Sequence, residues 1–263
     1  MKQIFARELK ANRKSLLFWS LGMFLLAAVG FAEYAIFKNN GTEIGPMIDM
    51  MPRVVKIMFG MGELPMDTAE GWYACMYLWL SFIAFMHAAL LGANIISKEE
   101  REKTSEFLFT RPIKRSTTLA GKMLAAVLNV LALALVAWAT SLAVLYPHIN
   151  GTSMVSGVSL TMLGMFITQM VFLFTGFLFS TLSPGRSGSY AAVAVIVAYI
   201  IAVLIEIQGN VDFLNVLSPF RYFHAAGVLA DGLSWVYVAL SAVLCAAAGF
   251  SSRFIFAGRD LRN

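Results

Sequence analysis

Long apolar segments, separated by short polar ones, make up most of this chain. A helix needs about 20 consecutive apolar residues to cross a hydrocarbon core of about 30 Å. Six segments reach this length, at about residues 15–37, 72–96, 118–146, 158–182, 189–207 and 232–256. The pattern therefore predicts an all-α membrane protein with a single transmembrane domain over residues 1–263 and six transmembrane helices.

Composition supports this class. Only 13% of the residues are charged and 59% are hydrophobic, whereas soluble domains carry about 25% charged residues. This leaves no room for a large soluble domain. The first apolar segment runs from Leu16 to Phe37, which is longer than the apolar region of about 7–15 residues in a signal peptide. We therefore expect it to be retained as the first span.

The positions of Lys and Arg predict the orientation, because cytoplasmic loops are enriched in these residues. If both termini are cytoplasmic, only four of the 20 Lys and Arg residues lie outside: Lys38, Arg53, Lys56 and Arg221. The termini can share one side only if the number of spans is even, and a six-span chain satisfies this. We expect a multi-pass protein of the plasma or inner membrane with both termini in the cytoplasm.

Three segments outside the spans have a pattern of their own. Residues 1–14 form either a basic amphipathic helix on the membrane surface or a plain basic flank. Residues 48–61 place apolar side chains at helical spacing, and Gly60-Met61-Gly62 would end that helix. Residues 213–231 are too apolar for an ordinary loop and too short for two spans, which favours a re-entrant or interfacial helix.

Small residues recur at four-residue spacing in the last two spans. Such stripes let helix backbones approach closely in lipid. They indicate either packing within the bundle or contact with a second subunit. The residues are Ala194, Ala198 and Ala202 in the fifth span and Ser241, Cys245 and Gly249 in the sixth.

Metal ligands are not clustered in the sequence. A structural metal site needs closely spaced Cys or His residues. The histidines are scattered and the cysteines lie far apart in apolar segments, so we expect no metal site and no catalytic centre. These residues are His87, His148, His224, Cys75 and Cys245.

Nucleotide and nucleic-acid sites are not predicted either. Gly121-Lys122 is not a phosphate-binding loop, because Ser116 stands where the first Gly is needed and Met123 where Ser or Thr is needed. The net charge of +5 follows the membrane topology rather than a nucleic-acid surface. We expect no cofactor in this chain.

A few polar residues lie inside the predicted spans. Polar groups at membrane depth either line a transport pathway or hydrogen-bond across helices. The candidates for a pathway role are His87, Asn94, Asn129 and Gln169.

One highly charged segment, residues 98–115, interrupts the apolar pattern between the second and third predicted spans. It holds four acidic and six basic residues, interleaved with Phe107, Leu108 and Ile113. Glu99 and Lys103 are spaced to support a helix, and Pro112 would end it at about Arg111. The pattern predicts a short, charged cytoplasmic helix suited to docking into another protein. A solvated loop is the alternative.

This segment resembles the signature of ABC-2 type transporter permeases. The resemblance rests on Glu99-Glu100, followed by Thr104, Leu108, Pro112 and Arg115. Lys103 departs from it, since the family usually has Gly at that position. The segment Ser218-Pro219-Phe220, before the last span, is also similar to the family.

The resemblance implies the permease of an ABC exporter rather than an enzyme. Two six-span subunits, identical or different, would form the pathway in the lipid bilayer, and a separate ATP-binding cassette subunit would hydrolyse ATP. The charged segment would then be the coupling helix seated in that subunit. Its coupling residues would be Glu99, Glu100, Thr104, Leu108, Arg111, Pro112 and Arg115.

Two other classes remain open at this stage. A gradient-driven secondary transporter is the main alternative. It calls for mid-span acids, broken helices and an internal repeat, and we identify no convincing repeat and no mid-span acid in the sequence. A membrane enzyme would need clustered nucleophiles or metal ligands.

Overall fold

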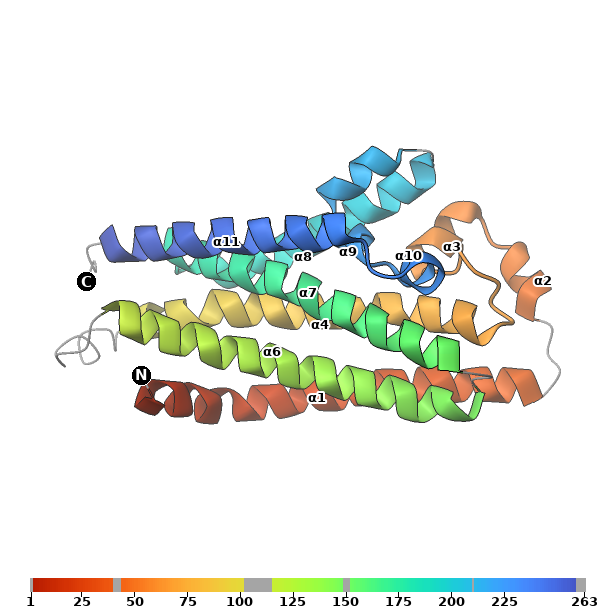
Figure 1. Cartoon of the computed structure of the whole chain (residues 1–263), viewed down its shortest axis with the longest axis horizontal. Helices are drawn as coiled ribbons and strands as arrows, with labels where there is room; N and C mark the ends of the chain where they lie inside the picture. Colours follow the sequence, from red (N-terminus) through yellow and green to blue (C-terminus); the bar gives the residue numbers. More distant parts are fainter. Residues whose placement is uncertain (1, 40–43, 102–114, 149–151, 210, 259–263) are drawn as a thin grey trace.

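The computed structural model describes residues 2–39, 44–101, 115–148, 152–209 and 211–258. Over these ranges the chain is helical and contains no strand. Six helices are long and apolar enough to cross a membrane, and they lie along the long axis of the molecule (Figure 1). The predicted all-α fold with six spans is confirmed. The six are α1 (Lys2–Asn39), α4 (Ala69–Arg101), α6 (Arg115–Leu145), α7 (Thr152–Leu182), α8 (Ser187–Gln208) and α11 (Trp235–Gly258).

Both ends of the described chain lie at the same end of the bundle, which we call the terminal end (Figure 1). There α1 begins, α4 ends, α6 begins and α11 ends. At the opposite, distal end, short helices connect the spans. These are α2 (Ile44–Asp49), α3 (Arg53–Phe59), the 3-10 helix η1 (Tyr146–His148), the 3-10 helix η2 (Asp212–Leu217), α9 (Pro219–Tyr222) and α10 (Ala225–Asp231).

The helix expected over residues 48–61 is divided in two. Pro52, with φ of −54°, precedes α3, and its ring prevents α2 from continuing into α3. The predicted stop at Gly60 is confirmed. Gly60 has a φ of 75°, the left-handed conformation that favours glycine, and its N–H donates to the carbonyl oxygen of Ile57 at 3.0 Å.

The helices α4 and α7 form the central pair of the bundle, and they touch through glycines. A Cβ added to Gly92 would lie 2.2 Å from the carbonyl oxygen of Leu173. A Cβ added to Gly176 would lie 2.3 Å from that of Ala89. The two backbones are therefore in direct contact, as small residues permit in lipid.

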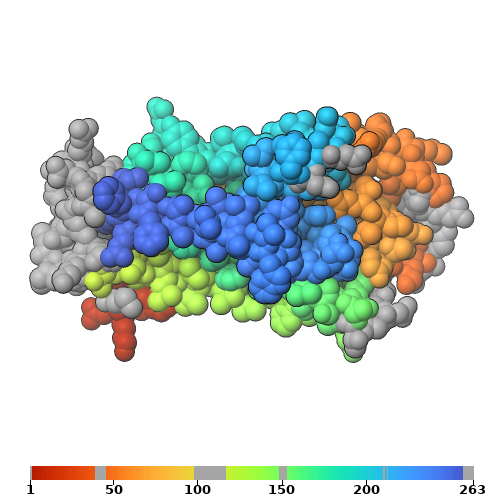
Figure 2. Space-filling model, turned by 45° about the horizontal axis from the view of Figure 1, so that its top comes forward, coloured from red at the N-terminus to blue at the C-terminus, as the bar shows by residue number. Residues whose placement is uncertain are grey.

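The other spans pack around this pair. Helix α1 packs on α6, α8 packs on α4 and α7, and α11 packs mainly on α7. The predicted small-residue stripes are used within the bundle: Ala198 and Ala202 are buried on α8, and Gly249 lies against Phe174 of α7. The opposite face of α11 is exposed along one side of the molecule (Figure 2), as the 72% exposure of Phe250 shows.

Candidate functional site

The predicted coupling residues lie at the terminal end of the bundle or outside the described residues. Helix α4 continues past the predicted end of the second span to Arg101, so Glu99 and Glu100 stand in its last turns. Arg115 is the first residue of α6. The remaining predicted coupling residues, Thr104, Leu108, Arg111 and Pro112, fall outside the residues that the structure describes.

The four predicted pathway residues lie on α4, α6 and α7 and make separate contacts. His87 is buried on α4, and its ring lies edge-on to Trp19 of α1, with the centroids 5.5 Å apart. Asn94 and Asn129 each donate to a carbonyl oxygen of their own helix at 2.7 Å. Gln169 Nε2 donates to the carbonyl oxygen of Ala84 on α4 at 3.5 Å, a hydrogen bond between helices.

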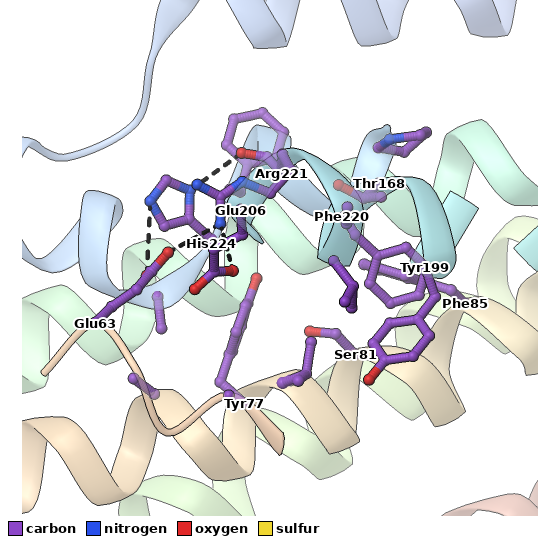
Figure 3. Close-up of a pocket in the computed structure, with 18 of the residues that line it drawn as sticks. Glu63, Tyr77, Ser81, Phe85, Thr168, Tyr199, Glu206, Phe220, Arg221 and His224 are labelled. Carbon is purple, nitrogen blue, oxygen red and sulfur yellow. Dashed lines mark hydrogen bonds and ion pairs between the residues drawn. The ribbon is translucent and has the colours of Figure 1, made fainter. Parts of the chain in front are cut away.

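Instead, a cavity of about 70 Å³ lies near the distal end, between α3, α4, α7, α8 and the α9–α10 segment. It has room for a few water molecules. None of the four predicted pathway residues lines it. Figure 3 shows polar and aromatic side chains converging on it from these elements. They include Tyr77, Ser81, Phe85, Thr168, Tyr199 and Phe220 along the walls and Glu63, Glu206, Arg221 and His224 on one side.

Arg221 joins two carboxylates from different parts of the chain. Its Nη1 donates to Glu63 Oε1 at 2.9 Å and to Glu206 Oε2 at 3.0 Å. Its Nε donates to Asn215 Oδ1 at 3.3 Å. The connection before α4, the end of α8, η2 and α9 are therefore tied together by one guanidinium group. Arg53 is a second cation near Glu206.

His224 extends this cluster. Its Nδ1 lies 3.1 Å from the carbonyl oxygen of Arg221, which fits an N–H at Nδ1. Its Nε2 lies 3.9 Å from Glu63 Oε2. A proton on His224 Nε2 would face the Glu63 carboxylate and strengthen the contact between His224 and Glu63.

Phe220 fastens the segment before α11 into the bundle. Its ring contacts aromatic rings on three helices, with centroid distances of 4.8 Å to Phe85 of α4, 6.0 Å to Phe172 of α7 and 5.7 Å to Tyr199 of α8. Ser218 Oγ donates to the carbonyl oxygen of Ala198 at 2.6 Å. The segment predicted to be re-entrant or interfacial is thus a series of short helical turns anchored in the distal end.

A second polar cluster lies at the terminal end, where sequence reasoning placed none. Lys122 Nζ lies 3.7 Å from Glu8 Oε1, and both side chains are less than 10% exposed. Lys122 Nζ also donates to the carbonyl oxygen of Ile95 at 2.7 Å. Glu8 is the only acid in the basic stretch of residues 1–14, and Lys122 is the only charged residue within the third predicted span. In the sequence, these two isolated charges are the features from which a buried ion pair could have been predicted.

The comparison with known proteins is consistent with this architecture. The model of the family described as ABC-2 family transporter protein matches residues 3–261, nearly the whole chain. No curated protein matches the sequence. Members of this family are membrane subunits that associate with an ATP-binding cassette subunit and do not themselves bind the nucleotide. The chain therefore belongs to the ABC-2 transporter family, as a multi-pass permease component of an ABC transporter.

Proposed function

We propose that this protein is the membrane-spanning subunit of an ABC exporter and that residues 99–115 couple it to the separate ATPase. The observation that carries the proposal is the position of the two helices that flank this segment. The described part of α4 ends and that of α6 begins at the terminal end of the bundle, where α1 begins and α11 ends (Figure 1). An even number of spans with basic flanks at one end supports a cytoplasmic location for that end.

The sequence supports a docking role as well. Glu99 and Glu100 belong to residues 98–115, where four acidic and six basic residues are interleaved with apolar ones. A charged segment of this kind suits insertion into a cleft of the ATPase, where basic groups of the partner would pair with the two acids.

A second six-span subunit, identical or different, would complete the translocation pathway. The exposed apolar faces of α1, α8 and α11 leave room for such a partner within the bilayer. In this arrangement ATP hydrolysis in the partner subunit moves residues 99–115, and the spans transmit that movement to the distal end.

Co-purification tests the coupling assignment. The protein is isolated from its native membrane through a tag at Asn263, as wild type and as the variant Glu99→Lys/Glu100→Lys. We expect wild type to retain an ATP-binding cassette protein and the variant to lose it, while both insert equally well, because reversing two charges removes the attraction to the basic partner.

The matched control is Glu33→Lys/Asp67→Lys, which makes the same charge change at exposed residues away from the terminal end. It should retain the ATPase. If the Glu99/Glu100 variant holds its ATPase as well as the control does, these residues do not form the docking element. If wild type retains no ATPase, the permease acts without the partner we propose.

A further inference from the structure

Three helices meet at the buried ion pair of the terminal end. Glu8 belongs to α1 and Lys122 to α6, with 3.7 Å between Glu8 Oε1 and Lys122 Nζ. The Lys122 ammonium also donates to the carbonyl oxygen of Ile95 on α4 at 2.7 Å. On the other side of Glu8, Arg7 Nη2 lies 3.2 Å from the same Oε1. One ammonium group therefore connects α1, α4 and α6.

Stability alone does not account for this arrangement. Lys side chains near a membrane surface normally extend to water, but the Lys122 side chain is only 4% exposed and points into the bundle. Removing two charges from water costs about as much as their attraction returns, and well-packed apolar residues stabilise such a site equally well. The contacts of this pair join three helices at fixed positions.

That geometry is fixed close to the coupling segment. Ile95 lies six residues before the end of α4, and Lys122 lies seven residues after the start of α6. At 1.5 Å per residue, each is about 10 Å from the helix end that leads into residues 102–114. The ammonium therefore holds together the two helices that flank this segment.

The last turns of α4 are also fastened on their other side. Ser187, the first residue of α8, places its Oγ 3.0 Å from the carbonyl oxygen of Ala93 and 3.1 Å from Ser97 Oγ. All three atoms belong to buried residues. Helix α4 thus has polar contacts to α6 on one side and to α8 on the other, a few residues from its end.

We propose that Glu8 and Lys122 are positioning residues for energy coupling. They join the α1–α6 pair to the terminal end of α4, so that a displacement of the coupling segment moves both parts of the bundle together. Lys122 makes the link to α4, and Glu8 pairs with its ammonium group and orients it. This inference rests on the proposed coupling to an ATPase.

The test measures movement rather than stability. The double variant Glu8→Gln/Lys122→Met removes both charges at once, so neither partner is left buried opposite a missing charge. Spin labels replace Leu135 on α6 and Leu204 on α8, which are 51% and 59% exposed, in a background with Cys75→Ala and Cys245→Ala. The distance between the labels is measured in the complex with its ATPase, without nucleotide and with ATP and vanadate.

We expect the label distance in the wild-type complex to change little between the two states, because the ion pair makes α6 move with α4 and therefore with α8. In the double variant the change in distance between the two states should be about three times as large or more. Lys122→Arg should behave as wild type, because a guanidinium can donate to Ile95 and pair with Glu8. Lys14→Met, at an exposed residue of α1 near the same end, should also behave as wild type.

The outcomes separate the two proposals. If the double variant forms the complex and its label distance changes as little as in wild type, the ion pair has no positioning role, while the permease function stands. If wild type retains no ATPase, the proposed function fails and this inference fails with it. If the double variant does not fold, Glu8→Gln alone, which keeps the size of the side chain, gives the answer by the same measurement.

Discussion

Arg221 is the residue whose removal should most clearly disturb the distal end. In Arg221→Met the apolar part of the side chain is largely kept, but the guanidinium disappears from between Glu63 and Glu206. Two charge-assisted hydrogen bonds, at 2.9 and 3.0 Å, are lost. The two carboxylates then face each other with Arg53 as the remaining cation near Glu206.

The exposed fractions of the side chains set the magnitude. Removing one partner of a fully buried pair costs about 3–5 kcal/mol, and an exposed pair contributes less than about 1 kcal/mol. Here Arg221 is 14% exposed and its partners 29% and 24%. The interaction therefore falls between these limits, and we expect the free energy of unfolding to drop by about 2 kcal/mol.

Reversible unfolding in mixed lipid–detergent micelles, followed by tryptophan fluorescence, measures this loss. Arg186→Met is the control, because Arg186 is exposed in the turn before α8; it should change the free energy by less than about 0.5 kcal/mol. Combining Arg221→Met with Glu206→Gln should cost about 1 kcal/mol less than the two single changes added together. Strict additivity, or a loss as small as that of the control, would refute the interpretation.

Two further substitutions test the packing, each by the same unfolding measurement. Gly92→Ala should lower the free energy of unfolding by about 2–3 kcal/mol, since its Cβ would meet the Leu173 carbonyl oxygen at 2.2 Å; Gly22→Ala, where nothing lies within 4 Å, should not lower it. Phe220→Ala should cost about 3 kcal/mol because its ring contacts three helices. Phe213→Ala, at a residue 76% exposed, should cost less than about 0.5 kcal/mol. Equal losses within either pair would contradict the packing described.

The six spans could be predicted because each contains enough apolar residues to cross the hydrocarbon layer. The ends of the helices were harder to predict, because the length of an apolar segment reflects the thickness of the hydrocarbon layer and not the length of the helix. Helix α1 begins at Lys2, well before the predicted start near residue 15. Basic residues such as Lys10 and Lys14 favour the helix as much as apolar ones do, so the helix continues through them.

The two polar clusters could not be predicted from the sequence, for a different reason. Each depends on residues that are distant in the sequence: Arg221 and Glu63 are 158 positions apart, and only the fold brings them together. The glycine contact between α4 and α7 had a local signal in Ala88-Ala89 and Gly92-Ala93. This spacing is like that of the small-residue stripes in the last two spans, so the sequence does not show which helix it contacts. The fold does, because it places Gly176 of α7 opposite these residues.

The length of α1 has a mechanical consequence. Its 38 residues measure about 57 Å at 1.5 Å per residue, whereas the hydrocarbon layer is about 30 Å thick. A typical tilt of about 20° takes up only a few ångströms of this excess, so the helix extends well beyond that layer. Glu8 lies near one end, about 46 Å from Asn39. If α1 pivots as a rigid rod about Glu8, a rotation of about 5° displaces its distal end by about 4 Å, which makes α1 a lever that amplifies small movements at the terminal end.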